Sequence, residues 1–393
     1  MSTSEAVSAA PARRTLRPLF LSLTITAIAA VLFGVPWWTL FVAGADWPTP
    51  VVVAGTALFL AAFVGLPVLM SLGHGRRRLD WAARIGDTLL GVVWVFFAWA
   101  LLGNVLRLGL AVAGVPEPAR SRLTAAVVVA TSLALLLWGY REAMRVPRVR
   151  RVEVPIRRLG AGLDGLRVVL LTDTHYGPID RADWSARVVA TVNALEPDLV
   201  CHTGDIADGT VDQRRAQAAP LREVRARLAR AYVTGNHEYL GEAQDWLDHM
   251  RELGWEPLHN RHIVVERDGA RLVVAGVDDV TAEGSGQPGH RADHAAALAG
   301  ADPTLPVLLL AHQPKQIDAA VAHGVDLQLS GHTHGGQIWP FHLLVRLDQP
   351  TVRGLTRHGD RTHLYTSRGT GFWGPPFRIF APSEITLLTL RSA

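Results

Sequence analysis

The chain has 393 residues, of which 49% are hydrophobic and only 19% are charged. Soluble domains carry about 25% charged residues, so this composition predicts a chain that is partly embedded in a membrane. It excludes a mostly disordered chain, because disorder requires low hydrophobicity and high charge. The single cysteine, Cys201, excludes an intramolecular disulfide and a cysteine-ligated zinc or iron–sulfur cluster.

The formal net charge of +4 is unevenly distributed along the chain. Residues 1–151 contain 15 Lys and Arg against 6 Asp and Glu, whereas residues 152–393 contain 24 against 29. The basic excess therefore lies in the N-terminal part, and the C-terminal part is mildly acidic. Domains that bind nucleic acid usually carry a basic patch of their own, so a nucleic-acid partner is not favoured.

Four apolar stretches follow one another in the N-terminal part, and each provides the ~20 residues that cross a bilayer core as a helix. We expect these transmembrane helices at about 18–38, 50–73, 88–110 and 123–140. An N-terminal tail (1–17) precedes them, and a basic juxtamembrane linker with a first strand (141–164) follows. Asn104 and Arg107 are the only notable polar residues inside the stretches, so the pattern favours an anchor over a transport pathway.

The arginines outside these stretches predict how the chain crosses the membrane. The tail contains Arg13, Arg14 and Arg17, the first loop (39–49) contains no arginine, and the second loop and the segment after the fourth stretch are again rich in arginine. Because basic loops stay in the cytoplasm, we expect a multi-pass protein of the cell membrane with both termini and the C-terminal part in the cytoplasm. No small-residue cleavage site ends the first stretch, so we interpret it as an uncleaved signal anchor.

From about Val152 onward the pattern changes to short apolar runs that alternate with amphipathic stretches. Such alternation predicts an α/β domain. The expected helices cover 182–195 and 211–229, and the expected strands are 166–172, 199–202, 272–277, 306–311, 327–329, 363–367 and 385–390.

Polar residues gather where these apolar runs end. The clusters are Asp173-Thr174-His175, Gly204-Asp205-Ile206-Ala207-Asp208, Gly235-Asn236-His237-Glu238, His312 and Gly331-His332-Thr333-His334-Gly335-Gly336-Gln337. Strand ends of an α/β sheet open into one crevice, where such domains place their sites. Imidazole together with carboxylate or amide oxygen suits Mn, Fe or Zn better than Ca or Mg.

This ordered set, D-x-H, G-D-x-x-D, G-N-H-E, a lone H and G-H-x-H, resembles the calcineurin-like metallophosphoesterase superfamily over residues 165–393. The segments 367–371 and 381–386 are similar to a bacterial membrane-associated branch, and spans before such a domain also occur in transmembrane metallophosphoesterases. The resemblance implies a four-layer α-β-β-α sandwich, here preceded by an all-α region of four transmembrane helices. It also implies a phosphate-ester substrate and two divalent metal ions, with manganese favoured over iron and zinc.

The resemblance assigns residue roles position by position. It implies a first metal site of Asp173, His175, Asp205 and His334 and a second of Asp205, Asn236, His312 and His332. Asp205 would bridge the two ions. His237 resembles the acid that protonates the leaving group, and Asp208 would orient it. Two ions ~3.5–4 Å apart hold a bridging hydroxide that attacks phosphorus.

Several residues near these motifs could either take part in the site or have only a structural role. Gly336 either brings the backbone close to the site or makes a plain turn, and Gln337 either contacts substrate or does not. The aromatic residues near the motifs form either an apolar rim around the site or ordinary packing: Trp339, Phe341, Phe372, Trp373 and Phe377. Gly209 stands where protein phosphatases of this superfamily have arginine, which weakens the case for a phosphoprotein substrate.

We therefore expect a membrane-anchored phosphoesterase with two metal ions that hydrolyses a phosphate mono- or diester, either a small molecule or lipid-linked. Three alternatives remain at this point: a non-catalytic membrane scaffold that binds a phosphoryl ligand, a nuclease, and a transporter. The complete set of polar residues, the acidic C-terminal part and the scarcity of charges in the spans count against them in that order.

Overall fold

The computed structural model describes residues 12–393, with side chains from Leu23 onward. They form two compact units, one comprising the chain up to Leu69 together with Val92–Ala134, and the other comprising Met70–Gly91 together with Leu135–Ala393. Residues 1–11 of the expected N-terminal tail lie outside the described part of the chain.

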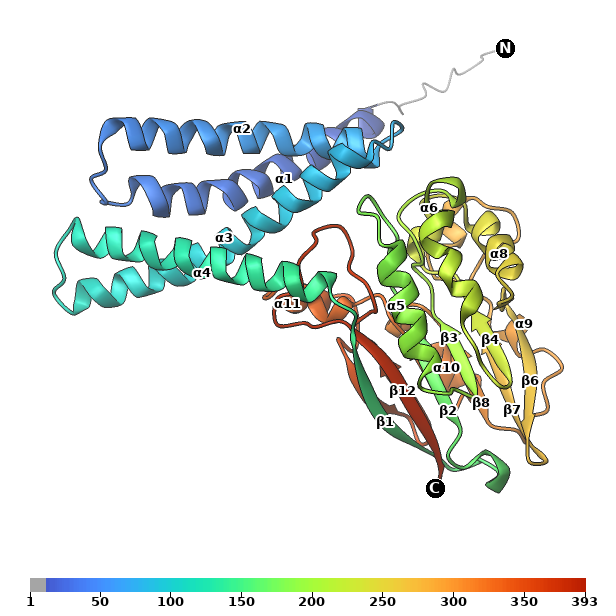
Figure 1. Cartoon of the computed structure of the whole chain (residues 1–393). Coiled ribbons are helices and arrows are strands. Elements are labelled where there is room, and N and C mark those ends of the chain that lie inside the picture. The colour runs from blue at the N-terminus through green and yellow to red at the C-terminus, as the bar shows by residue number, and fades with distance from the viewer. Residues whose placement is uncertain (1–11) are drawn as a thin grey trace, which may run out of the picture. The chain divides into compact units, whose positions relative to one another are not determined.

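Four long helices make up the N-terminal part, drawn in blue to green in Figure 1: α1 (Ala12–Trp37), α2 (Thr49–His74), α3 (Asp80–Val112) and α4 (Ala119–Met144). Their lengths of 26, 26, 33 and 26 residues exceed the ~20 residues that a bilayer core requires. By length and composition all four are candidate membrane spans. A short π-helical turn (Trp38–Val42) continues α1.

Helix α3 begins at Asp80, ahead of Thr88, where the apolar stretch in the sequence begins. The early start has a local cause: Asp80 stands in the first turn, where a carboxylate suits the positive end of the helix dipole. Ala82 and Ala83 follow, and alanine is the strongest helix former.

The first unit packs its helices through a small apolar core and pairs its few polar groups. The Asn104 amide donates to Thr39 Oγ1 at 2.7 Å and to the Ala100 carbonyl at 2.8 Å. Arg107 forms an ion pair with Glu117 at 2.9 Å. Both polar residues that stood out in the predicted spans therefore hold helices and loops of this unit together.

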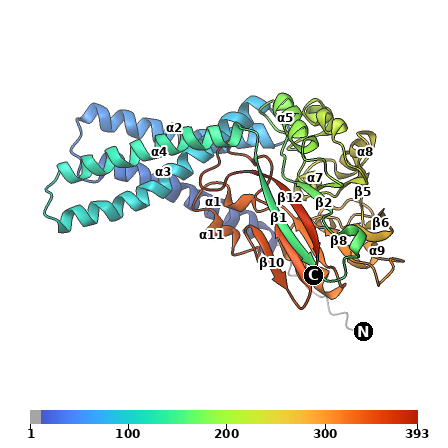
Figure 2. The ribbon, with the colours of Figure 1, turned by 60° about the horizontal axis from the view of Figure 1, so that its bottom comes forward.

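Two six-stranded sheets form the centre of the second unit (Figures 1 and 2). The first has the order β1 (Arg148–Ile156), β12 (Glu384–Ser392), β2 (Arg167–Leu171), β3 (Leu199–His202), β4 (Ala229–Tyr232) and β5 (Glu256–Pro257). The second has the order β10 (Gly354–His358), β11 (Thr362–Thr366), β9 (Leu327–Ser330), β8 (Val307–Leu310), β7 (Ala270–Gly276) and β6 (Arg261–Arg267). Strands β2 to β5 are parallel, as are β7, β8, β9 and β11.

Side-chain alternation along the strands explains how the layers stack. Val168 and Leu170 of β2 point into the core between the sheets, whereas Val169 and Leu171 point outward. The outward residues of the first sheet are covered by α5 (Ala182–Asn193), α6 (Val211–Ala218) and α8 (Ala243–Glu252), and those of the second by α9 (His294–Ala297) and α10 (Ile317–Ala322). The result is the four-layer α-β-β-α sandwich, so the expected fold class is confirmed.

The expected helix over 211–229 is wrong in its second half. Helix α6 ends at Ala218, a 3-10 turn covers Ala219–Glu223, and Ala229 already begins β4. Pro220 lacks the backbone N–H that would continue the helical hydrogen bonds, which accounts for the break.

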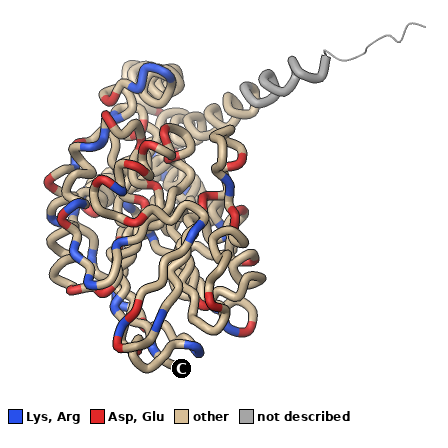
Figure 3. The backbone as a smooth tube through the Cα atoms, turned by 90° about the vertical axis from the view of Figure 1, so that its right-hand side faces the viewer, with Lys and Arg blue, Asp and Glu red and all other residues tan. Residues whose placement is uncertain are grey.

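Charged residues of both signs are mixed along the C-terminal part on the side that Figure 3 shows. Blue and red segments alternate there, with no long run of one sign. This distribution fits the mildly acidic balance of residues 152–393.

Candidate metal centre

Several predicted site residues follow strand ends in backbone conformations that residues other than glycine seldom adopt. Asp173, His175, Asp205, His332 and His334 all have positive φ values, between 43° and 68°. Such left-handed residues cost roughly 1–2 kcal/mol each and concentrate at functional sites. Backbone hydrogen bonds hold them, among them Asp173 N–H to the Gly204 carbonyl (3.0 Å) and His175 N–H to the Asp205 carbonyl (3.1 Å).

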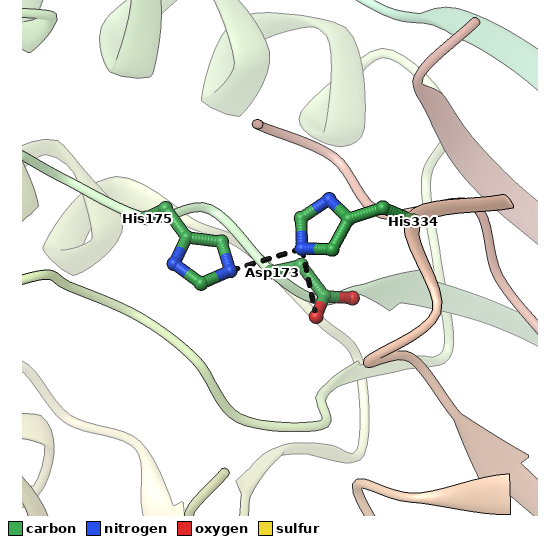
Figure 4. A group of neighbouring side chains, drawn as sticks. All are labelled: Asp173, His175 and His334. Atoms are coloured by element: carbon green, nitrogen blue, oxygen red, sulfur yellow. Dashed lines mark hydrogen bonds and ion pairs between the residues drawn. The ribbon is translucent and has the colours of Figure 1, made fainter. Parts of the chain in front are cut away.

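The first group of candidate ligands consists of Asp173, His175 and His334, all buried (Figure 4). The Nε2 atoms of the two imidazoles face each other at 3.0 Å, and His334 Nε2 lies 3.5 Å from Asp173 Oδ1. Ligands that each lie ~2.1 Å from one ion stand at about this separation from one another. The donor set therefore fits a divalent cation.

The second group brings together Asp205, Asn236, His312 and His332. Asn236 Oδ1 lies 3.1 Å from His312 Nε2 and 2.8 Å from His332 Nδ1. His312 Nδ1 donates to the Thr203 carbonyl at 2.7 Å, which leaves Nε2 free to act as a ligand.

Asp205 connects the two groups through one oxygen atom. Its Oδ2 lies 3.5 Å from His175 Nε2 and 3.2 Å from His312 Nε2. Burial by itself would raise the pKa of Asp205, but the charges of His312 and His237 outweigh it and hold the pKa well below its usual value. The carboxylate thus stays ionised between the groups.

His237 and Asp208 lie beside the first group. Asp208 Oδ1 accepts from His237 Nδ1 at 2.7 Å and from His175 Nδ1 at 2.9 Å. Burial alone would lower the pKa of His237, but the charges of Asp205 and Asp208 outweigh it and raise the pKa to about 9. One carboxylate therefore orients both a candidate ligand and the candidate acid.

The comparisons with known proteins agree with this geometry. Residues 166–336 match the model of the calcineurin-like phosphoesterases. The chain is 36% identical to a "transmembrane protein with metallophosphoesterase domain" from Danio rerio, over 80% of this chain and 74% of that protein. The protein of the same name from Bos taurus is also 36% identical, over 73% of this chain and 67% of that protein. The chain belongs to the calcineurin-like metallophosphoesterase family.

Bacterial members of the family are similar as well. An uncharacterised metallophosphoesterase from Helicobacter pylori strain J99 is 38% identical, over 66% of this chain and 68% of that protein. The Danio rerio match covers more of this chain than its C-terminal domain provides, so it extends into the helical part. This metallophosphoesterase is accordingly a metal-dependent phosphoric ester hydrolase with relatives described as transmembrane proteins.

Two buried residues support the site without having been predicted for it. The Glu238 carboxylate accepts from the backbone N–H groups of Gly235 (2.6 Å), Asp205 (3.0 Å) and Ile206 (2.8 Å), and so ties the turns that carry Asp205 and Asn236 together. In the sequence, the signal for the role of Glu238 was its place as the last residue of the G-N-H-E motif.

Arg378 is the second such residue, and its side chain is fully buried. Its guanidinium donates to the carbonyls of His334 (2.7 Å), Arg368 (2.8 Å) and Gly371 (3.0 Å). Burial lowers its pKa to about 9. Arg378 fixes the backbone of His334 through contacts that are remote in sequence, and no local pattern indicated them.

Gly336 and Gln337 line a small cavity of about 130 Å³ beside His332 and His334. Gly336 has a φ of 84°, and a side chain there would overlap the backbone of His342. The Gln337 side chain donates to the Trp373 and Pro375 carbonyls (2.6 and 3.0 Å). As arranged, Gln337 therefore orders the loop that carries Trp373.

Some of the aromatic residues near the motifs belong to ordinary packing, and one is placed to form part of an apolar rim around the site. Phe372 and Phe377 are buried, and the Arg181 guanidinium lies 4.4 Å from the Phe372 ring, so both belong to the packing. Trp373 is 43% exposed, with its ring 6.2 Å from the ring of His237. Trp373 is thus placed to form part of an apolar rim.

Proposed function

We propose that this metallophosphoesterase is anchored in the cell membrane and hydrolyses a phosphate mono- or diester at a centre of two divalent ions. The observation that carries the proposal is the position of Asp205 Oδ2, within 3.5 Å of a candidate ligand from each group. A carboxylate oxygen so placed suits a ligand shared by two cations.

The proposed ligands are those expected from the sequence: Asp173, His175, Asp205 and His334 for one ion, and Asp205, Asn236, His312 and His332 for the other. When bound, the two ions would supply Lewis acidity and a water of lowered pKa for attack on phosphorus. Nitrogen and oxygen donors without thiolate favour Mn, Fe or Zn, and we propose manganese.

The protein's own groups have separate tasks in this proposal. His237 is held through Nδ1 by Asp208, so its Nε2 is the atom available to protonate the leaving oxygen. Asp208 positions His237 and His175 together, which couples the acid to the first ligand group. Cations nearby lower the pKa of an imidazole, and the Asp208 carboxylate counters that effect.

The proposal also includes the orientation of the chain. The arginine-rich tail, second loop and post-membrane segment support a cytoplasmic C-terminal domain. A pair of reporters fused to the C-terminus, one active only in the cytoplasm and one only outside it, tests this placement. Activity of the external reporter alone would overturn it.

Hydrolysis assays on the full chain in detergent test the activity itself. With Mn²⁺ present, the protein should cleave p-nitrophenyl phosphate or bis-p-nitrophenyl phosphate, and Asp205→Ala should lose both metal binding and turnover. If the metal-loaded protein is inactive and Asp205→Ala binds metal as well as the unaltered chain does, the proposal fails. The scaffold alternative would be supported by metal binding without any turnover.

A further inference from the structure

The segment between α2 and α3, residues 70–91, belongs to the same compact unit as the C-terminal domain. We call it the interhelical segment. It contains the last turn of one candidate span, a short turn, and the first turns of the next. In the sequence it stood out only as an arginine-rich loop.

Its first attachment to the domain is an ion pair between the buried Arg214 and the half-exposed Asp80. Both nitrogens of the Arg214 guanidinium fork bind the Asp80 carboxylate, at 2.8 and 2.5 Å, while Arg214 Nε donates to the Asp208 carbonyl at 3.0 Å. Arg214 is only 5% exposed. A bidentate pair of this kind is geometrically specific. The segment is thereby linked to the residue that orients His237.

The second attachment is a close approach of backbone to side chains. A Cβ at Gly91 would lie 2.6 Å from Phe377 and 2.8 Å from Pro375, so only glycine fits there. The loop that holds Trp373 and Pro375 therefore rests directly on α3. Both attachments place the interhelical segment against the surface that carries the proposed acid.

Between the segment and the domain lies a cavity of about 440 Å³, within the range of small-molecule sites. The domain contributes Asn236, His237 and Trp373 to its lining, and the segment contributes His74, Arg78 and Leu90. A phosphoryl group at the metal centre would fill only part of this volume. The remainder must receive the rest of the substrate.

The lining of the cavity is partly polar and partly apolar. Asn236 and His237 are its polar residues from the candidate metal centre, and Met70, Leu90 and Leu240 are apolar residues of the same lining. Met70 and Leu90 belong to candidate membrane spans, and Leu240 is 74% exposed. The apolar part of the lining therefore includes residues from two candidate spans.

We propose that the interhelical segment is a wall of the substrate site and that the substrate is an amphiphilic phosphate ester. Its phosphoryl group binds at the metal centre, where Arg78 of the segment supplies a further positive charge, and the apolar tail extends along Leu240 toward Met70 and Leu90. This inference rests on the proposed function. It gives the spans a second task, because their ends select the substrate as well as hold the domain.

Calorimetric titration of the Mn²⁺-loaded full chain with alkylphosphonates tests the inference without requiring turnover. Each methylene buried adds about fourfold in affinity. Octylphosphonate should therefore bind about sixtyfold more tightly than ethylphosphonate if three of its extra methylenes are buried. Equal affinities for the two would overturn the inference.

Two matched pairs of variants distinguish binding of the alkyl chain in the cavity from its partition into the detergent micelle. Leu240→Ser should reduce the preference for the octyl compound at least fivefold, whereas Leu347→Ser, an 83% exposed leucine outside the cavity, should not change it. A chain-length preference that survives Leu240→Ser unchanged would reflect partition into the micelle and would refute the assignment.

Arg78→Gln should weaken both phosphonates at least tenfold, whereas Arg77→Gln, an exposed neighbour outside the lining, should leave them unchanged. Equal effects of the two arginine variants would overturn the role of the segment. Failure of the proposed function is distinguishable, because it would appear as absent hydrolysis of p-nitrophenyl esters while these titrations still report the chain-length preference.

Discussion

Replacement of Arg378 by methionine should destabilise the domain strongly. Methionine has a similar length, so it fills the space but donates no hydrogen bond. Three carbonyl oxygens, those of Arg368, Gly371 and Ala381, would lose their donors, which now lie 2.8, 3.0 and 3.3 Å away, whereas the His334 carbonyl would keep the Gln337 N–H at 3.0 Å. They would remain buried, because Arg378 is fully buried itself.

The magnitude follows from these contacts. A buried polar group left without a partner costs about 1–3 kcal/mol, so three carbonyls cost about 3–9 kcal/mol. Removing the buried charge returns a few kcal/mol of desolvation energy. A net loss of about 3–5 kcal/mol results, which lowers the melting temperature of a domain of this size by about 6–20 °C at 2–4 °C per kcal/mol.

Thermal unfolding of the full chain in detergent, followed by tryptophan fluorescence at one scan rate, measures this loss. The exposed Arg157 serves as the control, and Arg157→Met should shift the apparent melting temperature by less than 2 °C. Arg378→Lys should lose nearly as much as Arg378→Met, because one ammonium cannot reach all three carbonyls. A shift below 3 °C for Arg378→Met would refute the reasoning.

Three further outcomes are expected. His237→Ala should lower kcat about 10²–10⁴-fold while the metal content stays constant by mass spectrometry, whereas a loss of metal would show that His237 supports the ligands instead. Burial raises the pKa of Cys201 to about 12, so below that pH the native thiol keeps its proton, and at pH 8.5 iodoacetamide should modify it at least about a hundredfold more slowly than in the unfolded chain. Rapid labelling of the native protein would contradict that burial. Gly336→Ala should lower the apparent melting temperature by at least 3 °C because it overlaps His342, while Gly284→Ala, which faces open space, should not.

The strand-end motifs were predictable because their meeting point depends on topology alone. Parallel strands bring their carboxyl ends to one edge of a sheet, so the aspartates after β2 and β3 converge in the first sheet and the histidines after β8 and β9 in the second, and the packing of the two sheets brings both groups together. The four-layer fold came from the resemblance carried by the same motifs. The motifs at the strand ends were thus sufficient to predict that these residues lie close together.

The supporting contacts were not predictable from local pattern. Arg378 acts on His334 across 44 positions of the chain, and Asp80 pairs with Arg214 across 134. Neither pair has a spacing that a helix or a strand would produce. The interhelical segment is a further example of contacts that a local pattern does not predict. In the sequence its arginines indicate membrane topology, and only the folded chain shows that Arg78 lines a cavity.

The pairing of β1 with β12 bears on how the domain can be separated from its helices. Strand β1 begins at Arg148, just after α4 ends at Met144, and it pairs with β12 along all nine residues. A chain shortened to residue 165 would lack this strand and expose the backbone of β12 as a new sheet edge, which invites aggregation. A soluble fragment should therefore begin before Arg148, and a protease that cuts between β1 and β2 should leave the two pieces joined through the sheet until denaturant separates them.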